Sequence, residues 1–126
     1  MPIKKVLHID DDEEDHEIFA SALLEANPDV EVVFADNARE ALETLENTEN
    51  HPDLIFLDLN MPGMTGQEFL LAIKKHPQLK NIPVNILSTS SHKPTIELVK
   101  EHGAKEFITK PDNYQDMVNI LKKELN

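Results

Sequence analysis

Hydrophobic and polar positions along the chain form five successive units. Each unit begins with a short apolar run, and the runs are Lys5–Ile9, Val30–Ala35, Leu54–Leu57, Val84–Leu87 and Glu106–Ile108. Apolar runs with little internal alternation are typical of parallel strands that are covered on both faces. The longer stretches after the runs have the spacing of amphipathic helices. The pattern therefore predicts an α/β domain with a parallel sheet.

Capping residues and apolar positions place the five helices. Asp12 is expected to cap the first helix, and Ile18 is one of the apolar residues at helical spacing that follow it. Thr65 and Glu68 have the spacing of a capping box at the start of the third helix. The last helix is expected to begin at Tyr114, with that side chain buried.

The order of the strands follows from general rules of connection. Five strand–helix units joined by right-handed crossovers allow few strand orders, and 2-1-3-4-5 is the common one in doubly wound, flavodoxin-like folds. No linker or low-complexity segment interrupts the chain. Residues 1–126 are therefore expected to form one domain with no output domain attached.

The composition narrows the setting of this domain. The chain has no cysteine, which excludes disulfides, and its apolar runs are far too short to span a bilayer. The N-terminal residues lead directly into the first strand and lack the apolar region of a signal peptide. We therefore expect a cytoplasmic protein without membrane contact.

Charge is distributed unevenly along the chain. The net charge is −12, and residues 1–50 carry 15 Asp and Glu against three Lys and Arg, whereas residues 51–126 carry nine of each. A nucleic-acid-binding surface needs a positive field, so we expect no nucleic-acid partner. Most of the carboxylates are expected to face water. His8, inside the first apolar run, is expected to be a packed and hydrogen-bonded core histidine.

Polar side chains suited to phosphoryl chemistry stand at the ends of four apolar runs. Asp10 and Asp11 follow the first run, Asp58 the third, Ser88 the fourth and Lys110 the fifth. Parallel strands end on the same side of a sheet, so these side chains are expected to converge on one crevice. In the order 2-1-3-4-5, Asp58 lies one strand, about 4.8 Å, from the acidic pair on one side and from Ser88 on the other.

The residue types in this crevice suggest their roles. Neighbouring carboxylates repel one another, and a bound cation relieves that repulsion. Mg²⁺ takes oxygen ligands and also accepts phosphate oxygens. Phosphoryl transfer mainly needs positioning and charge neutralisation, and an aspartate can accept the group as an acyl phosphate. We therefore assign Mg²⁺ to the acidic pair and the nucleophile to the central Asp58.

From about Lys4 to Leu125 the chain resembles the receiver domains of response regulators, which share the fold of the bacterial chemotaxis regulator. The resemblance is carried by Ile9-Asp10-Asp11, Leu57-Asp58-Leu59-Asn60-Met61-Pro62-Gly63, Gly66, Leu87-Ser88 and Thr109-Lys110-Pro111. Their order and intervals are more specific than any single segment. The resemblance implies a two-component phosphorelay protein rather than an enzyme.

The resemblance also implies the ligands and the phosphoryl donor. Asp58 would accept a phosphoryl group from a sensor histidine kinase or a histidine phosphotransfer domain, and lose it by slow self-dephosphorylation. Asp11, Asp58 and the backbone carbonyl of Asn60 would bind Mg²⁺ directly, and Mn²⁺ could substitute. Asp10 would act mostly through water.

A switch is implied as well. Ser88 would hydrogen-bond the phosphoryl group, Lys110 would pair with it, and Phe107 would be an aromatic switch residue acting together with Ser88. A cis bond before Pro111 and an influence of Ser90 on self-dephosphorylation are also implied. Phosphorylation would alter binding of a downstream protein, or of a second copy of the chain, at the face of the fourth helix, fifth strand and fifth helix.

Other functions fit parts of the pattern. Asp10-x-Asp12 after a strand resembles the nucleophile motif of haloacid-dehalogenase-like phosphatases, but those proteins are typically larger and Asp58 would have no role. A receiver-like binding module that is never phosphorylated would not need the full set of site residues. Flavodoxin shares the architecture, but its first loop holds a phosphate where this chain has carboxylates. An EF-hand fails because Asp15 and Ser21 stand at its sixth and twelfth positions.

Overall fold

The computed structural model describes residues 3–61, 63–89 and 92–125, so Pro62 and Ser90 of the sequence motifs lie outside the described residues. Within these ranges, five parallel strands form one sheet in the order β2-β1-β3-β4-β5, which confirms the predicted topology. The strands are β1 (Lys5–Ile9), β2 (Glu31–Ala35), β3 (Leu54–Leu57), β4 (Val84–Ser88) and β5 (Glu106–Thr109).

Five helices follow the strands in the described ranges. They are α1 (Glu13–Ala26), α2 (Ala38–Glu46), α3 (Gly66–Lys75), α4 (Lys93–Glu101) and α5 (Tyr114–Leu125). Asp12 caps α1 as predicted, because its side chain accepts a hydrogen bond from the backbone nitrogen of Glu14 at 2.8 Å. Thr65 and Glu68 form the predicted capping box at α3. None of these helices has the length and apolar character needed to cross a bilayer.

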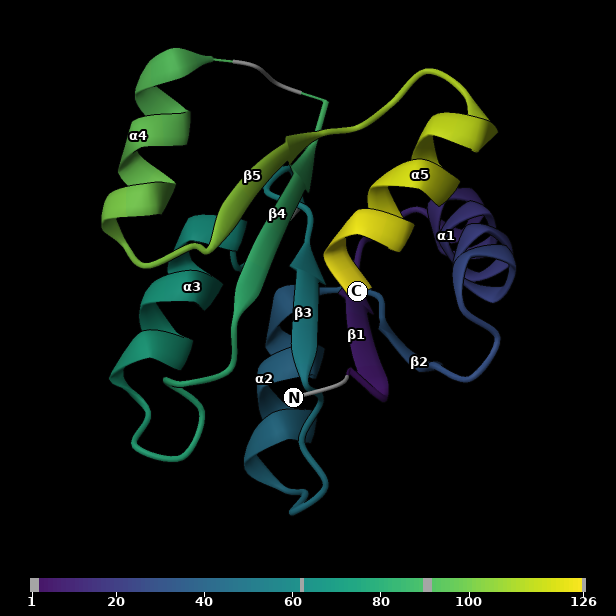
Figure 1. Ribbon diagram of the computed structural model, residues 1–126. Helices are drawn as coiled ribbons and strands as arrows, with labels where there is room; N and C mark the ends of the chain where they lie inside the picture. Colours follow the sequence, from purple (N-terminus) through teal and green to yellow (C-terminus); the bar gives the residue numbers. More distant parts are fainter. Residues whose placement is uncertain (1–2, 62, 90–91, 126) are drawn as a thin grey trace.

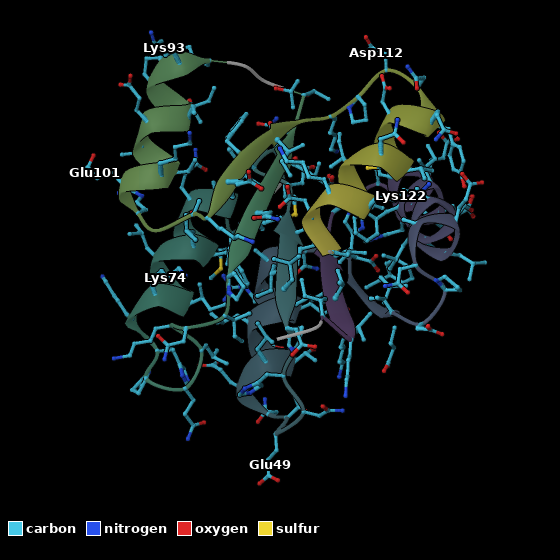
Figure 2. All side chains as sticks on the ribbon, in the orientation of Figure 1. Glu49, Lys74, Lys93, Glu101, Asp112 and Lys122 are labelled. Atoms are coloured by element: carbon cyan, nitrogen blue, oxygen red, sulfur yellow. The ribbon has the colours of Figure 1, made fainter. Side chains whose placement is uncertain are left out.

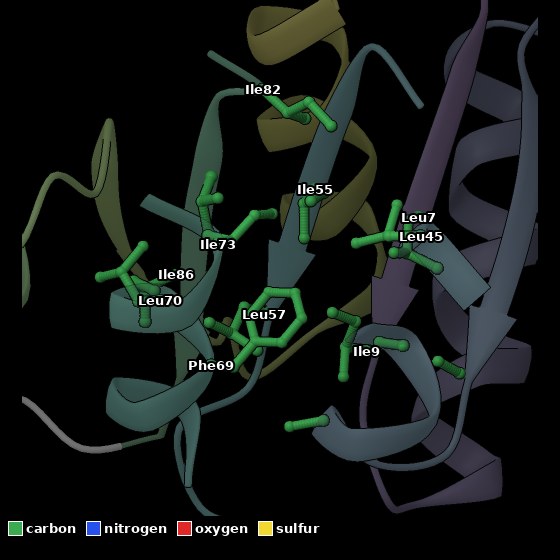
Figure 3. Packing of buried hydrophobic residues seen from close by; sticks show 14 of the residues in the cluster. Leu7, Ile9, Leu45, Ile55, Leu57, Phe69, Leu70, Ile73, Ile82 and Ile86 are labelled. Carbon is green, nitrogen blue, oxygen red and sulfur yellow. The ribbon is translucent and has the colours of Figure 1, made fainter. Parts of the chain in front are cut away.

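The helices cover the two faces of the sheet and create two hydrophobic clusters. α1 and α5 lie together on one face, and α2, α3 and α4 lie on the other (Figure 1). On the face covered by α2, α3 and α4, Phe69 and Ile73 of α3 pack against strand residues such as Leu57 (Figure 3). On the face covered by α1 and α5, Phe19 of α1 and Leu121 of α5 belong to the other cluster. All four residues of β3 are buried, which explains why its sequence is apolar without alternation.

Charged residues lie mainly on the outside of the helices. Lys93 and Glu101 of α4 point away from the sheet (Figure 2), and both are exposed, as is Lys122 of α5. At the rim formed by the carboxyl ends of the strands, by contrast, charged groups are buried.

Two apolar side chains that were expected inside are exposed. Ile18 is 45% exposed and Tyr114 is 41% exposed. On α1 the inward face is formed by His16, Phe19 and Leu23, a spacing that leaves Ile18 to one side. Tyr114 is the first residue of α5 and lies before the buried part of that helix. Both side chains border a shallow hollow of about 150 Å³ beside the loop after β5.

Gly66 allows α3 to approach the strand-end loop closely. A Cβ atom at this position would lie 2.7 Å from Leu59 Cα and 2.9 Å from the Asp58 carbonyl oxygen, and both are backbone atoms. Gly66→Ala is therefore expected to lower the free energy of unfolding by about 1–3 kcal/mol, although alanine is the better helix former. Urea unfolding measures this, with Gln67→Ala as the neighbouring control. An unchanged or higher midpoint would contradict the close contact.

Candidate functional site

The hydrogen-bond ladder of the sheet continues past the strand ends and fixes the backbone of the candidate residues. The Asp10 nitrogen donates to the Ala35 oxygen at 3.2 Å, and the Asp58 nitrogen donates to the Ile9 oxygen at 3.0 Å. The Lys110 nitrogen donates to the Ser88 oxygen at 2.8 Å. These side chains therefore start from one edge of the sheet, as the strand order predicts.

The three predicted carboxylates meet at this edge. Asp10, Asp11 and Asp58 each offer a carboxylate oxygen, and these three oxygens lie within 4.8 Å of one another. Asp10 and Asp58 are buried and Asp11 is exposed. Two buried carboxylates and one at the surface form an oxygen-only ligand set that opens to solvent. This donor set fits Mg²⁺ or Mn²⁺, which take carboxylate oxygens and retain waters.

Lys110 reaches the carboxylates from β5. Its Nζ lies 3.0 Å from Asp10 Oδ2, 2.9 Å from Asp15 Oδ2 and 3.7 Å from Asp58 Oδ2. Burial acts to lower the pKa of Lys110, but the hydrogen bonds to Asp15 and Asp10 and the charge of Asp58 raise it above its ordinary value. The ammonium is therefore fully charged at neutral pH.

The electrostatic surroundings of Asp58 differ from those of a surface aspartate. Burial raises the pKa of Asp58 from 3.8 to about 6, with smaller upward contributions from Asp10 and Asp11. The charge of Lys110 and a hydrogen bond from the Asn60 nitrogen to Oδ1, at 3.2 Å, oppose this rise. Burial makes the charged form of this carboxylate costly in free energy, so a cation that approaches it stabilises that form.

Of the remaining predicted residues, Ser88 and Asn60 have backbone hydrogen bonds to Lys110 and Asp58, whereas Phe107 lies in a hydrophobic cluster. Ser88 ends β4 and is fully buried, and its carbonyl accepts from the Lys110 nitrogen. The Asn60 backbone belongs to the loop that contacts Asp58. Phe107 on β5 is partly buried against the hydrophobic cluster of α2, α3 and α4. The ligand role of the Asn60 carbonyl and the switch role of Phe107 stay predictions.

One implied feature is wrong. The bond between Lys110 and Pro111 is trans, because the described residues contain no cis peptide bond. Trans is also the lower-energy form of an ordinary residue–proline bond. The backbone of Lys110 is held in place by its hydrogen bond to β4 with the trans bond present.

Asp15 was missed as a site residue. It stands in the acidic run of residues 10–15, in which Asp10 and Asp11 had been expected at the metal site and Asp12 as a helix cap. Once α1 begins at Glu13, Asp15 lies in the first turn beside the strand ends. Helix phase was the signal that could have identified it.

A buried histidine pair was also missed. His8 is packed as predicted, and its Nδ1 lies 2.8 Å from Nδ1 of His16. The ring of His8 stacks on Phe19, with centroids 4.1 Å apart. Burial lowers the pKa of His8 well below its usual value, and the charge of His16 acts in the same direction. The pair therefore links β1 to α1 as packed core residues.

A hollow of about 600 Å³ lies beside the carboxylate cluster. Asp11 is at its border, and its other lining residues come from α1 and from the end of β2, including Glu13, Phe34 and Asp36. Solvent therefore reaches the cluster from the side of Asp11.

Comparisons with known proteins agree with this geometry. Residues 6–122 match the family described as response regulator receiver domain. The chain is 35% identical over 117 residues to the two-component response regulator ORR8 of Oryza sativa subsp. indica, covering 93% of this chain and 94% of that protein.

Solved structures are similar over almost the whole chain. The phosphorylated cyanobacterial phytochrome response regulator RcpA has a TM-score of 0.89 at 34% identity, covering 97% of this chain and 91% of that one. The Mn²⁺-bound form of response regulator Rcp1 has a TM-score of 0.84 at 29% identity, covering 95% and 90%. Rcp1 is a protein of Synechocystis.

Proposed function

Because the chain belongs to the response regulator receiver domain family, we propose that it accepts a phosphoryl group on Asp58 from a sensor histidine kinase or a histidine phosphotransfer domain. Family membership makes it a two-component signalling domain rather than a classical enzyme. The observation that carries the proposal is the meeting of Asp10, Asp11 and Asp58 within 4.8 Å, with Lys110 in contact.

The contacts of the carboxylates favour Asp58 as the acceptor. Both oxygens of Asp10 are engaged, Oδ1 by the Asp12 nitrogen at 3.0 Å and Oδ2 by Lys110. Oδ2 of Asp58 has only the longer 3.7 Å approach of Lys110 among the described residues. This difference argues against the phosphatase alternative, in which Asp10 would be the nucleophile. A carboxylate oxygen with an open side is the better candidate for attack.

The transfer itself is a substitution at phosphorus. An Asp58 oxygen forms a bond to phosphorus while the bond from phosphorus to the donor's imidazole nitrogen breaks, and that nitrogen keeps the electron pair. The product is an acyl phosphate on Asp58. Lys110 neutralises phosphoryl oxygen charge, and the buried Ser88 hydroxyl is proposed to donate a hydrogen bond to it. Slow attack by water later releases inorganic phosphate and restores the carboxylate.

Asp10, Asp11 and Asp58, with the Asn60 carbonyl, are proposed to hold Mg²⁺, for which Mn²⁺ could substitute. A cation bound there would neutralise both the clustered carboxylates and the oxygens of the incoming group. The Mn²⁺-bound form of the relative Rcp1 supports this assignment.

Two surfaces are proposed to contact partners. The exposed apolar side chains of Ile18 and Tyr114 border a hollow that includes Pro111, the residue after Lys110, and are suited to dock the phosphoryl donor. The face of α4, β5 and α5 is proposed to bind a downstream protein or a second copy of the chain. β5 is an edge strand, and Leu98 on α4 is 42% exposed. A cytoplasmic location would bring these partners within reach.

Incubation with acetyl phosphate and Mg²⁺ tests the proposal. One acid-stable, alkali-labile phosphoryl group per chain is expected, detected as a mass increase and mapped to Asp58. EDTA is expected to reduce labelling by at least about tenfold, because clustered carboxylates then repel the anionic donor. Turnover of phosphate monoesters without labelling of Asp58 would favour the phosphatase. Neither labelling nor turnover by a folded protein would leave a binding module.

A further inference from the structure

Lys110 is shared between groups from two parts of the fold. Asp10 and Asp58 follow strands of the sheet, whereas Asp15 belongs to the first turn of α1. The shortest of the three contacts is the one to Asp15, at 2.9 Å, and the longest is the one to Asp58, at 3.7 Å. The ammonium therefore lies nearer to the helix than to the proposed phosphoryl acceptor.

We propose that Asp15 is a positioning residue that holds Lys110 away from Asp58 in the unphosphorylated protein and competes with the phosphoryl group for the ammonium. This inference rests on the proposed function, because it concerns regulation of the same site. It adds a residue outside the set that the sequence pattern identified.

The donor capacity of Lys110 supports the competition. An ammonium has three N–H donors, and two of them are directed to Asp15 and Asp10. The approach to Asp58 is too long for a good hydrogen bond. A phosphoryl group on Asp58 adds anionic oxygens that attract Lys110 more strongly than the carboxylate does. The third donor can reach that group only if the ammonium moves towards Asp58, and this movement lengthens at least one of its two existing contacts.

Exposure decides which contact weakens. The side chain of Asp10 is 1% exposed, so loss of Lys110 would leave a buried charge without its partner. The side chain of Asp15 is 35% exposed and can exchange the ammonium for water. The contact with Asp15 is therefore the one that yields. Phosphorylation would release the first turn of α1 from the end of β5.

The test compares Asp15→Asn with Glu14→Gln and Asp15→Glu in the full chain. Glu14 is exposed in the same helical turn, and its substitution removes one charge from a residue outside the ion pairs that Lys110 makes with Asp10, Asp15 and Asp58. Beryllofluoride, a phosphoryl mimic, is titrated with Mg²⁺ present and followed by NMR. Asp15→Asn is expected to bind it about three- to tenfold more tightly than wild type. Glu14→Gln and Asp15→Glu are expected to remain within about twofold of wild type.

Added salt distinguishes a direct contact between Asp15 and Lys110 from a long-range effect of the charge on Asp15. Near 0.5 M NaCl, charges about 10 Å apart are screened, whereas a direct contact is less affected, so the advantage of Asp15→Asn should persist. In wild type, the side-chain carboxyl ¹³C signal of Asp15 should move towards that of a solvated aspartate when beryllofluoride saturates the site.

Equal affinity in Asp15→Asn and Glu14→Gln, weaker binding by Asp15→Asn, or an unmoved Asp15 signal would each overturn the inference. Failure of wild type to bind beryllofluoride or to be labelled by acetyl phosphate would instead overturn the proposed function. Thermal melting without Mg²⁺ shows that each variant is folded.

Discussion

Asp58→Asn is expected to abolish phosphoryl acceptance and at the same time to stabilise the metal-free fold. Labelling by acetyl phosphate should fall at least about a hundredfold, because an amide is not a nucleophile that forms an acyl phosphate. Stability should rise because the pKa of Asp58 is raised to about 6 by burial, so its ionised form costs free energy in the folded protein. The two effects have opposite signs in one variant, which excludes simple misfolding as their cause.

The pH dependence of this stabilisation has a definite sign. A carboxyl whose folded pKa lies above its usual value binds more protons in the folded state between about pH 4 and pH 6. Ionisation of Asp58 therefore reduces the free energy of unfolding as the pH rises through this window. Solvent screening reduces the full effect, and Asp58→Asn should gain about 1–2 kcal/mol at pH 7.5. The gain should disappear below pH 4.

Urea unfolding without divalent cations, at pH 3.5 and 7.5, measures this gain. Asp112→Asn is the matched control, since Asp112 is exposed in the loop before α5 (Figure 2). Adding Mg²⁺ should stabilise wild type more than Asp58→Asn, because only wild type keeps all three carboxylates. A variant that is less stable than wild type at pH 7.5 without Mg²⁺ would contradict the assigned environment of Asp58.

Lys110→Ala is expected to lower the free energy of unfolding by about 2–4 kcal/mol at pH 8. The substitution leaves Asp10, Asp15 and Asp58 without the ammonium that contacts all three. The charge of Lys110 lowers the pKa of Asp58, so this pKa rises further when the ammonium is removed. Acidification then neutralises this carboxylate, so the deficit should shrink as the pH falls from 8 towards 5.

Chemical unfolding at several pH values, with Lys80→Ala as an exposed control, measures this deficit. Millimolar Mg²⁺ should restore part of the lost stability by supplying positive charge to the same carboxylates. A deficit that neither pH nor Mg²⁺ changes would show that Lys110 contributes packing and not charge.

Much of the fold was predictable because its local signals agree with its topology. Strands covered on both faces, such as β3, have apolar sequences without alternation, and the capping box at Thr65 and Glu68 locates the start of α3. It was also predictable that one edge of the sheet would carry the acidic pair, Asp58, Ser88 and Lys110, because parallel strands bring their carboxyl ends to one edge.

Other contacts were not predictable in the same way, since they depend on side-chain phase at helix ends. Asp15 faces Lys110 and His16 faces the core because α1 begins at Glu13, and the run of carboxylates shows which member faces the site only once that start has fixed the helix phase. Tyr114 has a large aromatic side chain of the kind often found in a core, but its position as the first residue of α5 leaves it exposed. The trans bond at Pro111 was mispredicted, since it had been implied by family resemblance alone.

The contact between Lys110 and Asp10 joins side chains 100 positions apart in the chain. During translation, a ribosome-bound chain whose β5 is still inside the exit tunnel lacks this ammonium, even if its earlier strands have already paired. Such a nascent chain holds the acidic cluster without its counter-charge, and should be a poor substrate for a kinase. If Asp58 is the phosphoryl acceptor, the chain is therefore expected to become competent only after nearly all of this domain has been synthesised.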